Sequence, residues 1–276
     1  MLKRRAAALC LIVLVVLRAQ TPIWAQEETI VRFSDRRGDD LGGGTLLYPN
    51  HPVYVAGLFD LLQFRVAQDD MHVYFDFQFA ALTNPFQAPE GYFHQRLEVY
   101  IETGNKMGCT EMQIGPHRLQ TNPDWGWSYR LSVAPFGESR LYVVDGQSVQ
   151  AFSEGVGSQS LSASQTIRVQ VPRELLPHPD PAWGYYVLVG SFDGLARDFW
   201  RDLGEGPWQV GGSGVPIFDL LAPRLGARTQ RAQLTKGILY PVSKNRVHLV
   251  PYLLGAMGTG TVIVCFFLWR WRHGRT

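Results

Sequence analysis

Residues 73–79 read Val-Tyr-Phe-Asp-Phe-Gln-Phe, in which every odd position is apolar and Asp76 and Gln78 occupy even positions. Because side chains of a β-strand point alternately to opposite faces, this period of two predicts a strand with one buried face. Similar alternation occurs at residues 62–66, 97–101, 129–133, 141–143, 167–171 and 185–189, with Asn-Pro, Asp-Gly and proline-rich turns between the runs. Many short strands with regular turns predict an all-β fold, an antiparallel β-sandwich of the jelly-roll kind.

The N-terminus has the pattern of a secretory signal. Three basic residues at positions 3–5 precede an uncharged run from Ala6 to Leu17, and a small-residue site ends at Ala25. A basic start, an apolar run and small residues before a cleavage point are typical of signal peptides. We therefore expect residues 1–25 to direct export of the chain.

The C-terminus has the pattern of a membrane anchor. Residues 247–269 contain one ionisable side chain, that of His248, and a helix of about 20 apolar residues crosses a bilayer. The arginines of residues 270–276 favour a cytoplasmic tail. The pair Ala256 and Gly260 would let two such helices approach closely, which makes a weak homodimer a further expectation. We predict a single-pass type I protein of the cell membrane with its domain facing outside.

The charges are sorted along the chain. The net charge is +2, but residues 1–25 and 223–276 hold 13 of the 26 basic residues and no acidic residue. The remainder carries 13 basic and 24 acidic side chains, a net charge of −11. An acidic outer domain argues against a nucleic-acid partner and suits divalent cations. Residues 223–246 show no apolar period, so we expect a basic juxtamembrane stalk that lies against anionic lipid headgroups or a cell-envelope polymer.

No pattern in the sequence predicts an enzyme. Gly-x-Ser-x-Gly, Cys-x-x-Cys and His-Glu-x-x-His motifs do not occur,. Glu98 and Glu102 are candidate carboxylates, but a glycosidase needs two of them at a defined separation in a cleft, and nothing in the sequence fixes such a pair. Only Cys109 lies between the signal and the membrane segment, so no disulfide within the domain is expected,. The domain is predicted to be non-catalytic, and its stability is expected to come from a hydrophobic core and not from disulfides.

A second stretch, residues 34–49, concentrates chemistry suited to a hard cation. Asp35, Asp39 and Asp40 fall within six residues and are followed by three consecutive glycines, which allow the backbone to aim several oxygens at one point. The spacing does not fit an EF-hand loop. We predict a calcium site from these three carboxylates and Asp60 of the following loop. The alternative is that each carboxylate serves a separate turn or cap.

Eight short pieces of the sequence follow one order that resembles a known family. The pieces are Gly38-Asp39-Asp40-x-Gly, Tyr48-Pro49, Gly57-Leu58-Phe59-Asp60, Asn84-Pro85-Phe86 with Gly91-Tyr92-Phe93-His94-Gln95, Val99-Tyr100-Ile101, Val187-Leu188-Val189-Gly190-Ser191-Phe192-Asp193-Gly194, Trp208-Gln209-Val210-Gly211-Gly212 and Phe218-Asp219-Leu220-Leu221. Together they are similar to the C-terminal module of glucodextranase, over nearly all of residues 30–222. Two residues depart from the pattern of that family, since Phe86 and Phe192 stand where Trp and Gln are common.

The resemblance implies a β-sandwich at residues 26–222, similar to DOMON domains and family-nine carbohydrate-binding modules, that binds a glycan or a cell-envelope polymer. Flat aromatic rings suit the apolar faces of sugars, and loops present functional side chains on a sandwich. The candidate carbohydrate-binding residues therefore lie beside turns, with burial in the core as the alternative for each. They are Trp125, Trp127, Trp183, Tyr185 and Trp208.

Two other functions stay open from the sequence. DOMON-like domains can hold haem for electron transfer, which needs axial ligands in one pocket. The available ligands are Met71, His72, Met107 and Met112, and no spacing pairs them. The third possibility is a purely structural surface protein that binds neither ligand.

Overall fold

The computed structural model describes residues 27–104, 108–146, 148–226 and 228–243. The predicted signal peptide 1–25, membrane helix 247–269 and tail 270–276 lie outside the described residues. Within the described ranges, every helix is too short or too polar to cross a bilayer.

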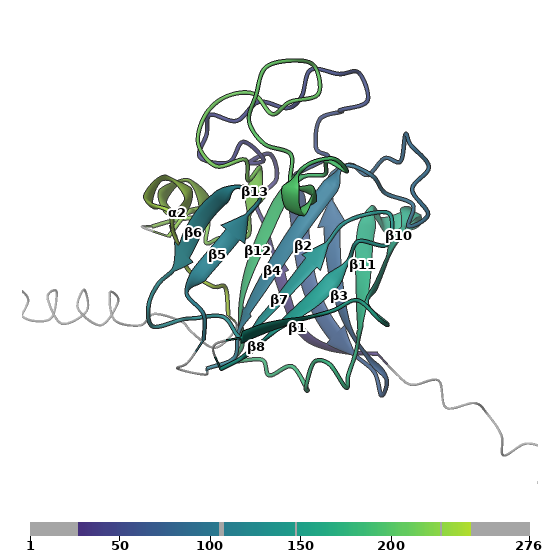
Figure 1. The fold of residues 1–276 in the computed structure, drawn as a ribbon, viewed down its shortest axis with the longest axis vertical. Coiled ribbons are helices and arrows are strands. Elements are labelled where there is room, and N and C mark those ends of the chain that lie inside the picture. Colours follow the sequence, from purple (N-terminus) through teal and green to yellow (C-terminus); the bar gives the residue numbers. More distant parts are fainter. Residues whose placement is uncertain (1–26, 105–107, 147, 227, 244–276) are drawn as a thin grey trace, which may run out of the picture.

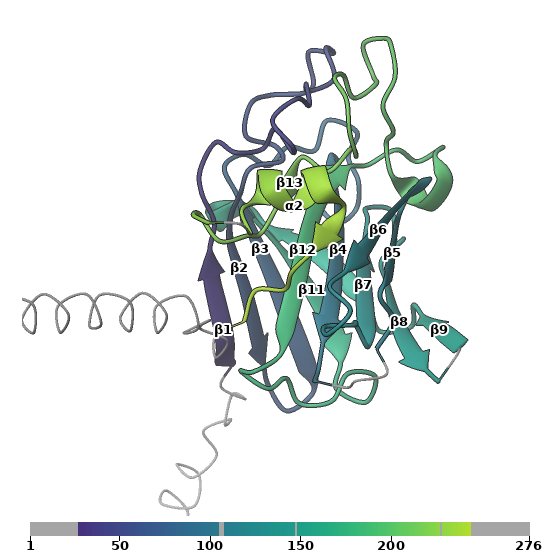
Figure 2. The same cartoon turned by 90° about the vertical axis from the view of Figure 1, so that its left-hand side faces the viewer.

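Two sheets face one another and form most of the molecule (Figures 1 and 2). The first has the strand order β1 (Glu28–Ser34), β2 (Leu61–Gln68), β3 (His72–Phe79), β11 (Thr166–Pro172) and β10 (Gly157–Leu161). The second has the order β13 (Asp219–Leu220), β12 (Gly184–Ser191), β4 (Gln95–Glu102), β7 (Tyr129–Val133), β8 (Arg140–Asp145) and β9 (Ser148–Phe152). Neighbouring strands in both sheets are antiparallel. The predicted antiparallel β-sandwich is confirmed, and the finer jelly-roll, DOMON-like topology stays a prediction.

The core lies between the two sheets and is rich in aromatic rings. The odd positions of β3 all point inward, and Phe75 and Phe77 are fully buried, as the alternation of residues 73–79 predicts. The ring of Phe64 lies 5.3 Å from that of Phe77 on the neighbouring strand and 5.5 Å from that of Tyr185 in the opposite sheet. Aromatic burial across the sandwich therefore supplies much of its stability.

A small third sheet covers the outer face of β4 and β12 (Figure 2). Its strand order is β14 (Ile238–Leu239), β6 (His117–Thr121) and β5 (Glu111–Ile114), and β14 runs parallel to β6. Tyr100 and Tyr186, on the outer face, pack with Met112 of β5 in a second hydrophobic cluster. Every residue of β4 and β12 is buried for this reason. The alternation expected at residues 185–189 of β12 is therefore wrong: these residues are Tyr-Tyr-Val-Leu-Val, and an uninterrupted apolar run is typical of a strand buried on both faces,.

Residues 229–243 pack on the body of the domain, where the sequence analysis expects a stalk without secondary structure. They form α2 (Gln230–Lys236) and β14. Gln230 accepts a hydrogen bond from the backbone N–H of Leu220, at 2.6 Å, and Gln233 accepts one from that of Tyr240, at 2.7 Å. Both glutamines are buried. Because α2 is held by buried glutamines and not by an apolar stripe, its sequence lacks the apolar periodicity that predicts a helix. Two 3₁₀ turns complete the described elements, η1 (Ser162–Ser164) and η2 (Arg197–Phe199).

A buried ion group joins β4 to β7 beneath the third sheet. The Glu98 carboxylate is fully buried and accepts hydrogen bonds from Arg130, at 2.6 and 2.7 Å, and from Arg96, at 2.6 Å. Burial alone would raise the pKa of Glu98, but the charges of Arg130 and Arg96 outweigh it and hold the pKa below its usual range,. Glu98 is therefore permanently ionised and enclosed, which suits a structural role and not proton transfer.

We expect Glu98→Gln to lower the free energy of unfolding by about 3–5 kcal/mol, because it leaves two guanidiniums without their shared anion. The matched control is Glu138→Gln, which removes a half-exposed partner of Arg140 and should cost no more than about 1 kcal/mol. Denaturant unfolding of both variants measures the difference. Equal stability of the two variants would contradict the structural role of Glu98.

Candidate functional site

Three aspartates from distant parts of the sequence meet at one end of the sandwich. Asp39 lies in the loop after β1, Asp60 directly precedes β2, and Asp219 begins β13. Each offers one carboxylate oxygen, and these three oxygens lie within 4.8 Å of one another. Since β2 belongs to the first sheet and β13 to the second, the cluster connects the two halves of the sandwich. Carboxylate oxygens so arranged are ligands that hard divalent cations prefer.

Several oxygens of this cluster and of the neighbouring Asp35 accept no hydrogen bond within the described part of the chain. Asp219 is fully buried; its Oδ2 accepts the backbone N–H of Leu61, at 2.8 Å, while its Oδ1 accepts no hydrogen bond from the described residues. Asp35 is 6% exposed and its Oδ2 is likewise unpartnered, as is Oδ1 of Asp39. Buried polar atoms are normally satisfied, so unpartnered oxygens on carboxylates that also lie close together indicate a ligand,. The residues present therefore fit a metal ion.

The carboxylates repel one another in this buried position. Burial raises the pKa of Asp35 to about 7, and the charges of Asp39 and Asp60 add to the effect. Burial also raises the pKa of Asp219 well above its usual range, with further contributions from Asp35, Asp39 and Asp60. The pKa values of Asp39 and Asp60 are raised as well, first by burial. Like charges without a counter-charge are unstable at short range, so the cluster needs protons or a cation.

The predicted metal residues are partly brought together. Asp39 and Asp60 belong to the triad, and Asp35 lies close enough to influence the pKa of Asp219. Asp40 instead accepts a hydrogen bond from the hydroxyl of Tyr48 and lies outside the triad. Sequence reasoning missed Asp219. The available signal was an aspartate inside the apolar run 217–221, a place where burial without a partner is costly.

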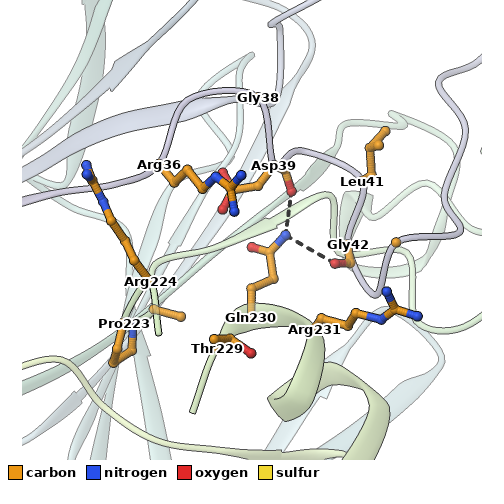
Figure 3. A pocket seen from close by; sticks show the side chains of 12 residues that line it. Arg36, Gly38, Asp39, Leu41, Gly42, Pro223, Arg224, Thr229, Gln230 and Arg231 are labelled. Atoms are coloured by element: carbon orange, nitrogen blue, oxygen red, sulfur yellow. Dashed lines mark hydrogen bonds between the residues drawn. The ribbon is translucent and has the colours of Figure 1, made fainter. Parts of the chain in front are cut away.

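The loop that carries Asp39 is fixed by α2. The side-chain amide of Gln230 donates to the backbone carbonyls of Asp39, at 2.5 Å, and Gly42, at 3.1 Å (Figure 3). The N–H of Gly42 donates to the carbonyl of Phe218, at 2.7 Å. Gly42 has φ +58°, and a Cβ there would lie 2.5 Å from the carbonyl oxygen of Ile217. Only glycine fits this position, because both the backbone conformation and the space exclude a side chain.

We expect Gly42→Ala to destabilise the protein by more than about 1–2 kcal/mol, through the left-handed backbone and the clash. Gly43→Ala is the matched control, since a Cβ at Gly43 meets nothing within 4 Å. Thermal melts of the two variants make the comparison. A Gly42→Ala variant as stable as Gly43→Ala would show that the loop is not fixed as described.

Aromatic side chains gather in the loops at the same end. Trp208 is half-buried and stacks on His51, with ring centroids 3.8 Å apart. Tyr54 and Phe86 each lie 6.1 Å from the Trp208 ring. These residues come from loops 35–60, 80–94 and 200–218, parts of which rise above the sheets in Figure 1. Trp208 is the one predicted sugar-contact residue that lies among these loops.

Phe136 extends this aromatic surface through Phe93, whose ring centroid lies 4.5 Å from that of Phe86 and 6.1 Å from that of Phe136. Phe136 is also held in an unfavourable backbone conformation. Its φ is +62° and its side chain is 47% exposed. The carboxylate of Glu90 accepts the backbone N–H groups of Phe136, at 2.9 Å, and Gly137, at 2.7 Å. Phe86 is 46% exposed and precedes another left-handed residue, Gln87. Exposed rings kept in strained turns are more typical of binding sites than of unselected surface. We call Trp208, Phe86 and Phe136 the aromatic face.

The other four predicted sugar residues lie elsewhere. Tyr185 is fully buried in the main core and cannot stack on a sugar, so that prediction is wrong. Trp127 is 5% exposed in the second cluster and lines a separate cavity of about 320 Å³, so its role as a sugar contact stays a prediction. Trp183 is half-buried and stacks on Tyr129, with centroids 6.2 Å apart. Trp125 is half-buried beside Tyr240. The criterion used in the sequence, an aromatic residue beside a turn, therefore did not distinguish rings that are buried in the core from rings that lie in loops.

The haem alternative finds no support in the positions of its candidate ligands. Met71 is 69% exposed and adjoins His72, at the start of β3 in the first sheet. Met112 is fully buried under the second sheet, and Met107 lies outside the described residues. The described ligands therefore do not share a pocket.

In a comparison with known families, residues 30–250 match the C-terminal binding module, SLH-like, of glucodextranase. The chain belongs to this family. The match confirms the resemblance in the sequence and extends it past residue 222, which agrees with the packing of α2 and β14 on the domain. The matched region is a binding module and includes no catalytic domain. No curated protein matches the chain significantly.

Proposed function

We propose that this glucodextranase-type module is a calcium-stabilised domain that binds glycan at the cell surface and has no catalytic activity. The observation that carries the glycan assignment is the aromatic face, where Phe136 is exposed in a strained turn that Glu90 holds. Rings of this kind suit the apolar faces of pyranose sugars, and loops on a rigid sandwich are the usual place for them. Family membership in a binding module supports the same conclusion.

Calcium is the proposed ion for the aspartate cluster. The donor set consists of carboxylate oxygens, which select hard cations over the softer transition metals. Asp39, Asp60 and Asp219 would hold the ion, with Asp35 near them. The bound charge would remove the repulsion that raises the pKa values of these groups. Calcium here is a structural ion that fixes the loops and takes no part in a reaction.

Export and anchoring complete the proposal. The signal pattern of residues 1–25 and the apolar residues 247–269 support a type I protein in the cell membrane, with the module facing outside. One span would keep the module near its glycan or envelope polymer.

Calcium should raise the melting temperature of the full chain by about 5–10 °C over chelator, given about 2.7 kcal/mol of stabilisation at 100-fold excess over Kd. Asp219→Asn should abolish this shift while leaving the melt in chelator as high as or higher than that of the wild type, because it removes one repelling charge. Asp124→Asn, on an exposed turn, is the control. An unchanged wild-type midpoint in calcium and chelator would refute the metal site.

Retention of the full chain on immobilised dextran and a panel of cell-wall glycans tests the aromatic face. Phe136→Ala and Trp208→Ala should each weaken retention about tenfold, since each removes a stacking ring. Val149→Ala, which trims an exposed apolar side chain on β9, should change nothing. Absence of retention on every neutral glycan would refute the proposed ligand and favour a purely structural role.

A further inference from the structure

Two neighbouring cavities open beside the aspartate cluster and share Ala222 and Pro223 as a common wall. The first, of about 380 Å³, lies between loop residues 36–44 and the start of α2 (Figure 3). The second, of about 400 Å³, lies between the end of β1 and residues 240–243. We call them the arginine cavities, because five arginines line them: Arg36, Arg224 and Arg231 in the first, and Arg32 and Arg228 in the second.

The charge in these cavities is nearly all of one sign. Among the described lining residues, Asp39 is the only carboxylate of the first cavity, and the second has none. Arg65 and Arg168, by contrast, share Glu27 and Asp76 on the first sheet. No carboxylate in the described part of the chain lies within ion-pair distance of four of the cavity arginines: Arg32, Arg36, Arg224 and Arg231.

A positive concavity on an otherwise acidic domain concentrates anions near it. The basic residues 223–246, expected to be a stalk, supply three of these side chains as part of the folded body: Arg224, Arg228 and Arg231. Basic residues that are grouped near one end of the sequence therefore form one positively charged surface in the folded domain.

Aromatic rings hold one guanidinium of the second cavity in place. The guanidinium carbon of Arg228 lies 4.9 Å from the ring centroid of Trp125 and 4.3 Å from that of Tyr240. The two rings are nearly perpendicular, with centroids 5.6 Å apart. A planar guanidinium with a fixed orientation is suited to bidentate contact with a carboxylate or phosphate. The rings themselves offer apolar edges to a sugar.

We propose that the arginine cavities form a second binding site, for an acidic polysaccharide whose carboxylate or phosphate groups contact the guanidiniums. This rests on the proposed glycan-binding function and adds a ligand class that the uncharged aromatic face does not select. A polymer segment fits two adjoining hollows with aromatic walls. Anionic lipid headgroups are the competing ligand, because basic pockets near a membrane also bind them, and the experiment below separates the two.

The test uses the full chain in a neutral detergent, with binding measured to polygalacturonate, to poly(glycerol phosphate), to dextran, and to mixed micelles that contain phosphatidylglycerol. The first two probes separate a carboxylate from a phosphate source. The double variant Arg36→Gln with Arg231→Gln, whose side chains donate no hydrogen bond to described residues, tests the first cavity. Arg32→Gln tests the second cavity. Arg197→Gln is the control, because it removes one positive charge at an exposed residue of η2, away from both cavities.

We expect the double variant to weaken binding of at least one acidic polymer by about tenfold or more, and added salt to weaken it further. Dextran binding should not change, and Arg197→Gln should bind all probes as the wild type does. Equal binding of acidic polymers by wild type and both cavity variants, or no binding at all, would overturn the proposal. Binding of phosphatidylglycerol micelles alone would overturn it in favour of lipid headgroups. Dextran binding and its loss in Trp208→Ala test the aromatic face, whereas binding of the acidic polymers tests the arginine cavities. Either proposal can therefore fail while the other holds.

Discussion

The structure depends on four aspartates that are withdrawn from water at one end of the sandwich. Burial raises the pKa values of Asp35, Asp39, Asp60 and Asp219, and the charge of Asp60 adds to this at the other three. Among the described residues, no arginine forms an ion pair with them as Arg96 and Arg130 do with Glu98. The carboxylate of Asp219 also accepts the N–H of Leu61, so a residue of the second sheet fixes the start of a strand in the first. A proton or cation that neutralises this cluster would therefore act at the contact between the two sheets.

Both proposed ligand surfaces share the loop that the cluster holds. Residues 35–60 carry Asp35 and Asp39, and the same loop supplies Arg36 to the first arginine cavity and His51 beneath Trp208. An ion on the aspartates would restrict this loop before any glycan arrives, and a surface that is already ordered loses less conformational entropy on binding. A bound metal and a bound glycan would in this way be connected through one segment, without any contact between them.

The sequence predicted the parts of the molecule that follow a local pattern. Alternation at residues 73–79 gives β3 and its buried face. The acidic stretch 34–49 and the loop after it give Asp39 and Asp60 of the triad, although Asp40, predicted with them, lies outside it. What it missed depends on contacts between distant residues. Asp219 joins the cluster because β13 pairs with β12, and α2 is held by Gln230 and Gln233 rather than by an apolar stripe. Tyr185 and Trp208 both adjoin turns, yet one fills the core and the other lies in the loops, because ring burial depends on the opposite sheet.

The protein buries carboxylates at two places, Glu98 and the aspartate cluster, and their surroundings indicate a structural role for the first and a ligand-binding role for the second. Glu98 is enclosed with two guanidiniums, its hydrogen bonds are complete, and its pKa is lowered. The aspartate cluster is enclosed with no such partner, has unpartnered oxygens, and has raised pKa values. The first arrangement is self-sufficient and needs nothing from solution. The second would be stabilised by protons or by a bound cation, so it is the place where we expect the stability of the domain to depend on pH and on divalent cations.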